Sequence, residues 1–459
     1  MKNEIKATIV FEQIWKAIHA RNPDGTRKYR YIVNRGSSRS SKTRSIIQAY
    51  WLYALSISGQ RMSVWRDTKK DARDTVGYDM SVVYPAMIHY PNVTFNKTEA
   101  SYAFPNKSII EINGTDDENK VMGYNGDVAW FNEPYKISRG TFDQIDQRTV
   151  EFIIIDWNPK MAHWILDLEK DERTIVITST FKDNPFCPPE QKIKILSYQP
   201  VSACRIVKEK ILPEVEAKSY NLTDNPKGLP DKFLIELSRC KENERKNTAS
   251  AFNWSVYGLG EKAEKPNRIF HWTEISDDEY NKINVKRYYG SDWGVVDPWG
   301  VIEAKYLDGN LYLRQLNYDS ENQLKAKLSM TEIEQVNAKD EGLVMWHFER
   351  LGIPKKEIIL CDDNRPMKIV ALRAAGYDYA VAAGKGPGSI LEGISVLEKL
   401  RVFFTSSSTN LKYEQENYSR VTDRYGVVQE EAEDFDNHLI DPTRYIILFL
   451  KAQGIIKII

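Results

Sequence analysis

The stretch from Gly36 to Thr43 restricts the fold of this chain more than any other. It reads Gly-Ser-Ser-Arg-Ser-Ser-Lys-Thr, follows the β-prone run at residues 31–33 and precedes a helix-forming run at residues 46–52. Small residues between a strand and a helix let successive backbone N–H groups surround an anion, and the helix N-terminus adds partial positive charge. The pattern predicts the phosphate-binding loop of an NTPase, although a serine-rich turn before an ordinary helix would also fit it.

Individual residues of this loop have separate expected roles. Lys42 is expected to reach the β- and γ-phosphates of ATP, and the Thr43 hydroxyl to bind Mg²⁺. Ser41 stands where such loops usually have a second glycine, so it fits only if its φ stays in an allowed region. The predicted nucleotide-binding residues of the loop are Gly36, Ser37, Ser38, Arg39, Ser40, Ser41, Lys42 and Thr43.

Two polar residues follow a buried strand further along the chain. The apolar run at residues 128–131 ends in Asn132 and Glu133, and open α/β sheets bind ligands at the carboxyl ends of their strands. In an NTPase the first residue would support the Mg²⁺ shell and Glu133 would orient the attacking water. Asn132 brings no charge, so its expected role is weaker. Taken alone, a strand that ends in Asn-Glu is also structurally ordinary.

Length and composition limit the class of protein. A chain of 459 residues is too long for one ordinary core, which predicts two or three domains. We expect no membrane span, because no apolar run is long enough, and the four scattered cysteines do not predict a zinc site or disulfides. Lys and Arg balance Asp and Glu at 64 each, so contacts with nucleic acid would need local basic patches.

The order of β-branched runs predicts an α/β fold with two domains. Buried strands at 152–156 and 174–180 fit a mainly parallel sheet with helices on both faces. A polar, helical segment follows at about 189–260 and completes a first domain at 1–262. A second domain is expected at 267–459, where residues 301–306 and 311–315 predict an antiparallel pair across Asp308-Gly309.

Three aspartates of the second domain stand at strand ends or at a helix start. They are Asp292, Asp362 and Asp441. Converging carboxylates would hold the two divalent cations of phosphodiester hydrolysis, one activating water and one stabilising the leaving oxygen. His438 would share a helix face with Asp441 if the helix has already begun there, as a ligand or a proton carrier. The same aspartates also fit plain strand-end and helix-cap positions, and spacing alone does not separate these alternatives.

The order of these parts resembles the large terminase subunits of tailed bacteriophages, from about residue 29 to the C-terminus. The loop at 36–43 and the stretch Trp130–Glu133 are similar to that family's Walker A and Walker B motifs. Its coupling motif resembles Thr178–Thr180, with Asp156–Pro159, which includes Asn158, as a second familiar turn. The nuclease motifs are matched by Ser291–Gly294, Asp362–Pro366, Lys385–Ile390 and Asn437–Tyr445.

The resemblance implies a P-loop ATPase domain followed by an RNase H-like nuclease domain. It implies ATP and Mg²⁺ as cofactors of the first domain, and Mg²⁺ or Mn²⁺, held by Asp292, Asp362 and Asp441 with His438 nearby, for the second. Such a protein cuts concatemeric viral DNA and pumps double-stranded DNA into a procapsid in the host cytoplasm. Implied partners are the portal protein, the small terminase subunit and further copies of the chain in a ring, with no membrane.

The chain departs from the family's pattern at Ser41, at Asn132 in place of the usual aspartate, and at Pro442 in place of alanine. Candidates to bind phosphate or to act as an arginine finger are Arg39, Arg66 and Arg148.

Two other functions fit the same residues. One is an ATPase-nuclease of DNA repair or recombination without a capsid partner. The other is a non-enzymatic assembly protein with a decayed loop, against which the retained aspartate triplet argues.

Overall fold

The computed structural model describes residues 7–87, 92–339, 341–422, 428–433 and 436–456. The chain divides into two compact units, Met1–Glu264 and Lys265–Ile459. Residues 1–6 of the first predicted domain and 457–459 of the second lie outside the described residues. None of the described helices is long and apolar enough to cross a membrane.

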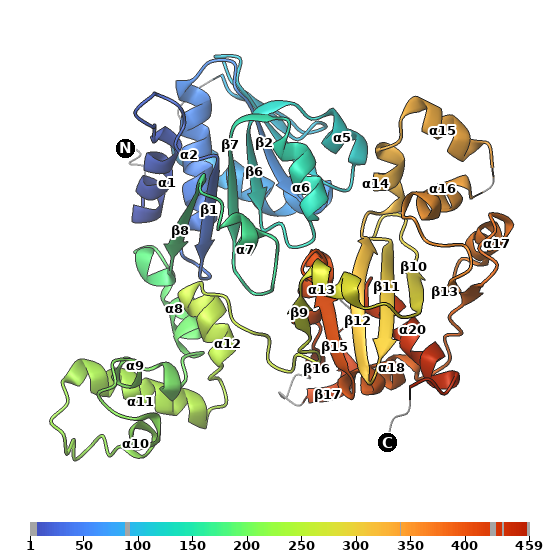
Figure 1. Cartoon of the computed structure of the whole chain (residues 1–459). Coiled ribbons are helices and arrows are strands. Elements are labelled where there is room, and N and C mark those ends of the chain that lie inside the picture. Colours follow the sequence, from blue (N-terminus) through green and yellow to red (C-terminus); the bar gives the residue numbers. More distant parts are fainter. Residues whose placement is uncertain (1–6, 88–91, 340, 423–427, 434–435, 457–459) are drawn as a thin grey trace. The chain divides into compact units, whose positions relative to one another are not determined.

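The first unit is built on an eight-stranded sheet (Figure 1). The strand order is β3-β4-β5-β2-β6-β7-β1-β8. The strands β5, β2, β6, β7, β1 and β8 run parallel to one another, and β3 and β4 add an antiparallel edge. The strands are β1 (Tyr31–Gly36), β2 (Arg61–Arg66), β3 (Thr94–Asn96), β4 (Ser101–Ala103), β5 (Ile109–Gly114), β6 (Gly126–Asn132), β7 (Thr149–Trp157) and β8 (Thr174–Ser179). The predicted mainly parallel sheet is confirmed.

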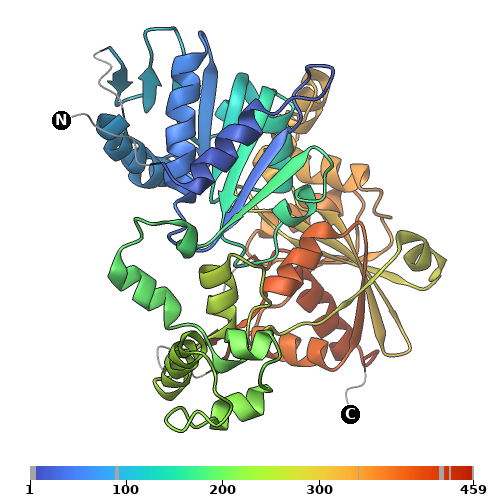
Figure 2. The ribbon, with the colours of Figure 1, turned by 90° about the vertical axis from the view of Figure 1, so that its left-hand side faces the viewer.

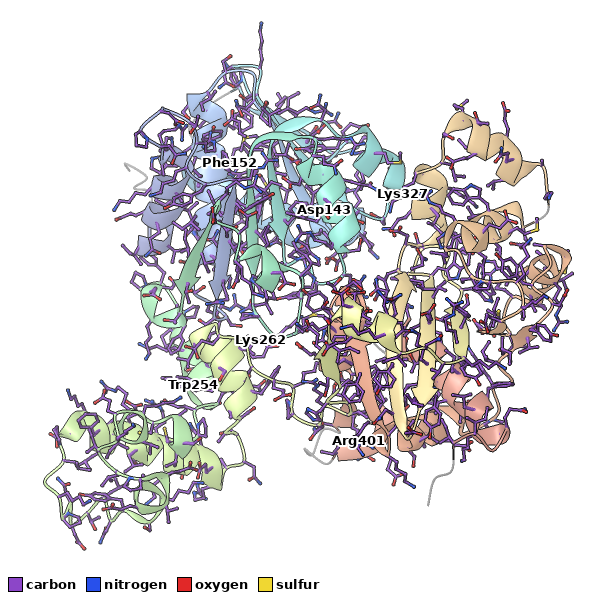
Figure 3. All side chains as sticks on the ribbon, viewed as in Figure 1. Asp143, Phe152, Trp254, Lys262, Lys327 and Arg401 are labelled. Atoms are coloured by element: carbon purple, nitrogen blue, oxygen red, sulfur yellow. The ribbon has the colours of Figure 1, made fainter. Side chains whose placement is uncertain are left out.

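Alternating side chains of these strands bury both faces of the sheet. Ile154 belongs to the core that packs under α1 (Ile9–His19) and α2 (Lys42–Ser56), which lie beside each other in Figure 2. Phe152, labelled in Figure 3, faces the same way and is fully buried. On the opposite face, Phe131 stacks near Phe142 of α6 (Arg139–Asp146). The near-continuous apolar runs therefore form strands buried on both sides.

The end of the first unit is helical, as the sequence predicts for residues 189–260. It contains α8 (Pro189–Leu196), α9 (Arg205–Lys208), α10 (Glu214–Ser219), α11 (Asp231–Arg245) and α12 (Ala251–Asn253). Much of it packs around its own apolar cluster, which includes Ile206, Leu212 and Leu237. The first unit also contains α3 (Lys69–Ala72), α4 (Tyr78–Met87), α5 (Glu118–Gly123) and α7 (Ile165–Leu168).

The second unit contains a mixed seven-stranded sheet in the order β14-β13-β10-β11-β12-β15-β9. Antiparallel β10, β11 and β12 are followed by β13 and β14, which run parallel to β10, and this is the strand arrangement of RNase H-like domains. The strands are β9 (Thr273–Ile275), β10 (Arg287–Asp292), β11 (Gly300–Leu307), β12 (Asn310–Asn317), β13 (Ile358–Cys361), β14 (Ala380–Ala382) and β15 (Arg401–Thr405); β16 (Arg420–Thr422) and β17 (Val428–Ala432) form a separate pair.

Helices cover both faces of the second sheet. Tyr288 packs with α18 (Ser389–Glu398) and α20 (Ile440–Ala452), whereas its neighbour Tyr289 packs with α16 (Gly342–Arg350) and α17 (Pro366–Ala374). The remaining helices are α13 (Asp277–Lys282), α14 (Glu321–Ala326), α15 (Met330–Asn337) and α19 (Thr409–Asn417). The predicted α/β fold class is confirmed in both units.

Candidate functional site

The phosphate-loop pattern joins β1 to α2, as predicted. β1 ends at Gly36 and α2 begins at Lys42. A Cβ on Gly36 would lie 2.5 Å from the Ser179 carbonyl oxygen, so this position has no room for a side chain. Ser41 adopts the left-handed conformation with φ of 72°, which strains a serine by about 1–2 kcal/mol. The loop thus keeps the backbone turn usually made by glycine.

Lys42 lies inside the loop with 7% of its surface exposed. Its Nζ donates to the carbonyl oxygens of Ser37 at 2.9 Å and Gly36 at 3.3 Å. Burial lowers the pKa of Lys42, while the charges of Asp156 and Glu133 oppose that shift. The ammonium group is therefore held next to the backbone that would surround a phosphate.

Glu133 comes directly after β6 and has a left-handed φ of 48°. Strained backbone of this kind gathers at functional sites. Its N–H donates to the Asp156 carbonyl oxygen at 2.8 Å, which fixes the turn. Burial raises the pKa of Glu133, and the charge of Asp156 raises it further. A carboxylate with a raised pKa is suited to orient and polarise a water molecule.

A cavity of about 650 Å³ opens beside the loop. Its size falls within the range of small-molecule sites. Its lining includes the predicted residues Ser38, Arg39, Ser40, Ser41, Lys42, Thr43, Glu133 and Asn158, together with Thr8, Arg44, Ser45, Gln48, Asp79, Asn184, Phe186, Pro188 and Gln191. The loop from Ser38 to Thr43, Glu133 and Asn158 therefore share one cavity, whereas the predicted residues Gly36, Ser37, Asn132 and Arg66 are not part of its lining.

The predicted arginines occupy different places. Arg39 lines the cavity. Arg66 instead donates to Asn132 Oδ1 at 2.9 Å and pairs with Glu133 at 3.6 Å and Asp71 at 2.7 Å. Arg148 immediately precedes β7, at the opposite end of that strand from Asp156, and donates to the Gln144 carbonyl. Within one copy of the chain, Arg148 thus lies at the end of the parallel strands opposite to the loop.

Asn158 supports the loop as well as lining the cavity. Its Nδ2 donates to the Gly36 carbonyl oxygen at 2.8 Å. On the other side of β1, Ser179 Oγ donates to Ser40 Oγ at 3.0 Å. The two turns compared with a coupling motif, at 156–159 and 178–180, therefore both touch the loop, one from each neighbouring strand.

Sequence reasoning missed two contacts of the loop. Thr43 Oγ1 donates to Asp156 Oδ2 at 2.8 Å, and the Ser38 N–H donates to the Tyr257 carbonyl oxygen at 3.1 Å. Asp156 ends a buried strand, which is the signal that identified Glu133. Tyr257 offers no such signal, because only the return of the helical segment to the loop brings it there.

The aspartates of the second unit lie at one end of its sheet. Asp292 ends β10 and Asp362 follows β13, its parallel neighbour, with the Asp362 N–H bonded to the Ser291 carbonyl at 2.8 Å. Asp441 lies in the first turn of α20. Tyr445 on the same helix donates to Asp292 Oδ1 at 3.1 Å, and all three carboxylates act on the pKa of Tyr445, which burial raises.

Each of these carboxylates is paired with a cationic or ionisable side chain. Lys385 lies 2.8 Å from Asp362, Arg444 pairs with Asp441, and His438 Nδ1 is 3.9 Å from Asp292. In the part of the chain that the structure describes, no three acidic, His or Cys side chains are grouped closely enough to hold a metal ion. The donors suit a hard divalent cation in type but not in their present placement.

The condition under which His438 would share a helix face with Asp441 is not met, because α20 begins only at Ile440. The start of the helix is set by Glu414 of α19, a buried carboxylate that accepts the N–H groups of Leu439 at 2.8 Å and Ile440 at 3.1 Å. Burial lowers the pKa of His438, but its pairing with Asp292 and the charge of Glu414 outweigh this and raise it to about 9. Pro442 fits the same first turn, where no intrahelical N–H is needed.

Several solved structures resemble the chain. The large terminase of a thermophilic bacteriophage is 16% identical, with 97% of this chain and 100% of that chain covered and a TM-score of 0.41. The bacteriophage HK97 large terminase is 14% identical, with 96% and 95% covered and a TM-score of 0.43. The nuclease domain of the bacteriophage SPP1 large terminase, with bound Mn, is 22% identical, with 41% and 99% covered and a TM-score of 0.33.

No curated protein matches the chain. A family model described as phage terminase large subunit matches residues 28–206. This range contains the phosphate loop, the strand that leads to Glu133 and both turns that touch the loop. Over residues 28–206, the chain is therefore similar to the large subunits of phage terminases.

Proposed function

We propose that this chain is the motor and nuclease subunit of a viral DNA-packaging machine, which hydrolyses ATP to drive double-stranded DNA into a procapsid and cuts concatemeric DNA. The observation that carries the ATPase is the shared cavity of Lys42, Thr43 and Glu133 beside a phosphate loop. The family match over residues 28–206 supports packaging as the use of that ATPase.

Residues of the loop suit a Mg²⁺–nucleotide complex. The Thr43 hydroxyl, at the start of α2, lines the cavity and is hydrogen-bonded to a buried carboxylate, so its oxygen is oriented and available to a hard cation. When bound, Mg²⁺ would neutralise phosphate charge. Loop N–H groups and Lys42 would bind the β- and γ-phosphates, and Glu133 would orient water and take up its proton.

DNA cleavage is proposed for the second unit. Asp292, Asp362 and Asp441 are the proposed ligands of Mg²⁺ or Mn²⁺, with His438 nearby as a proton carrier. In the structure, Asp292, Asp362 and Asp441 are paired with His438, Lys385 and Arg444. A metal ion would have to displace these side chains from the carboxylates. The RNase H-like sheet and the placement of the aspartates at one of its ends support this assignment.

The proposed partners follow from the family. They are double-stranded DNA, the portal protein, the small terminase subunit and further copies of the chain in a ring on the procapsid, all in the host cytoplasm. Stimulation of ATP turnover by portal-bearing procapsids would distinguish packaging from DNA repair.

ATP binding and turnover in two variants test the proposed ATPase. Lys42→Ala should lose nucleotide binding, because Lys42 contacts phosphate charge in the ground state. Glu133→Gln should bind ATP but lose turnover by roughly a hundredfold or more, because Glu133 acts on water. Lys170→Ala truncates a lysine side chain that is 76% exposed, and it is the control for Lys42→Ala. Full turnover by Glu133→Gln would contradict the proposal.

A further inference from the structure

The carboxylate nearest to Thr43 comes from β7 and not from β6, where Asn132 occupies the family's aspartate position. We infer that Asp156 is the positioning residue that prepares Thr43 for the Mg²⁺–nucleotide complex, taking over the part usually assigned to the residue at position 132. This inference rests on the proposed ATPase function. Asp156 belongs to a turn that resembles the family, but neither the sequence motif nor the family match gives this residue a role toward Thr43.

The hydrogen bonds of Asp156 carry the inference. Its Oδ2 accepts from Thr43 Oγ1 at 2.8 Å, and its Oδ1 accepts from Trp130 Nε1 at 2.7 Å. Asp156 is only 1% exposed. A threonine hydroxyl has one proton and two lone pairs, so a hydroxyl that donates to Asp156 keeps its lone pairs for a cation. The carboxylate therefore sets the orientation of the oxygen that Mg²⁺ would use.

The Asn132 side chain can donate hydrogen bonds to a carboxylate at position 156. The two residues are register partners on β6 and β7, and Asn132 Nδ2 donates to both Asp156 oxygens, at 2.9 and 3.2 Å. Its Oδ1 accepts from Arg66 at 2.9 Å. An aspartate at position 132 could not donate, and it would place a second negative charge against Asp156. The charge has thus moved one strand closer to the loop, because β7 lies between β6 and β1.

Electrostatic coupling places Asp156 within the same site. Its charge opposes the lowering of the Lys42 pKa and raises the pKa of Glu133. A purely structural role would make Asp156 important for folding but would leave the effect of Mg²⁺ on nucleotide affinity unchanged. The positioning role predicts a specific change in that effect.

The test measures ADP affinity of the full chain with Mg²⁺ and with EDTA, using a fluorescent ADP analogue. Asp156→Asn should keep its metal-free affinity within about threefold, because Lys42 and the loop are intact, but lose about tenfold to a hundredfold of the enhancement by Mg²⁺. The exchange Asn132→Asp with Asp156→Asn should restore part of the loss. Asp143→Asn, on α6 and labelled in Figure 3, changes a half-exposed carboxylate and should match the wild type.

Each outcome decides the inference separately from the ATPase proposal. If the wild type binds no ADP, the ATPase proposal fails; if it binds ADP and a folded Asp156→Asn keeps the full Mg²⁺ enhancement, only the inference fails. If Asp156→Asn does not fold, the double variant Asn132→Asp with Asp156→Asn is measured in its place, because it keeps the net charge and the hydrogen-bonding groups of the wild type. That variant should then show at least about threefold less enhancement than wild type, and equal enhancement would overturn the inference.

Discussion

The buried carboxylate beside the phosphate loop and the aspartates of the second unit differ in which side chains hold their negative charge. Around the loop, Asp156 is held by neutral donors from Thr43, Trp130 and Asn132, and among the described residues no cation forms a direct ion pair with it. In the second unit, Asp362 forms a direct ion pair with Lys385, and Asp441 forms one with Arg444. Under the proposed function, the first site is preorganised for a nucleotide, whereas the second would have to exchange protein cations for a metal ion.

The largest effect that separates the two regions is expected from the aspartates. Asp292→Asn and Asp441→Asn should each lower the rate of plasmid nicking with Mn²⁺ by about a hundredfold or more, because each removes a proposed metal ligand. ATP turnover should stay at the wild-type level. Asp378→Asn, which changes an exposed aspartate of the same unit, is the control. Undiminished nicking by both variants would place the nuclease site elsewhere.

Thermal melts with and without Mn²⁺ test whether the paired aspartates of the second unit bind a metal ion. Mn²⁺ at about a hundred times its dissociation constant should stabilise the wild type by about 2.7 kcal/mol. For a unit of this size, that corresponds to a rise in Tm of about 5–10 °C. Asp292→Asn and Asp441→Asn should gain less. Without metal, Asp441→Asn should be less stable than the wild type, because it removes the carboxylate that pairs with the buried Arg444. The same rise in all three proteins would mean that these aspartates do not hold the metal.

Two glycines test how tightly the backbone is packed around each site. A Cβ on Gly300 would lie 1.8 Å from the His438 carbonyl oxygen, and one on Gly36 would lie 2.5 Å from that of Ser179. Gly300→Ala and Gly36→Ala should each lower the free energy of unfolding by about 2 kcal/mol. Denaturant melts of the full chain measure this, with Gly123→Ala as a control for a glycine with open space around it and no positive φ. A change below about 0.5 kcal/mol for Gly300→Ala would contradict the close packing.

The smallest effect concerns the serine at the glycine position of the loop. Ser41→Gly and Ser41→Ala both remove the hydroxyl that lies 3.0 Å from Thr8 Oγ1, so they differ only in backbone freedom. At a φ of 72°, Ser41→Gly should be more stable than Ser41→Ala by about 1 kcal/mol. Equal unfolding free energies would argue against the left-handed turn.

Local sequence patterns predicted the strands and the loop because those features depend on neighbouring residues. The antiparallel pair predicted across Asp308-Gly309 forms as β11 and β12, and the loop lies between the predicted strand and helix. The contact of Thr43 with Asp156 could not be predicted, because it depends on β7 entering the sheet between β1 and β6.

The same limit explains why the sequence left open whether His438 lies on the helix of Asp441. The sequence shows an apolar helix but not its first residue, which is set by the Glu414 carboxylate from a different helix. Aspartates at strand ends were recognisable as candidates, whereas the lysine and arginine that pair with them become apparent only once the chain is folded.

The central claim, that this chain has two separate active sites, is tested most directly by measuring ATP turnover and plasmid nicking together in Lys42→Ala and Asp292→Asn. We expect Lys42→Ala to lose ATP turnover while it still nicks DNA with Mn²⁺, and Asp292→Asn to show the reverse. Loss of both activities in either folded variant, or retention of ATP turnover by Lys42→Ala, would contradict the claim.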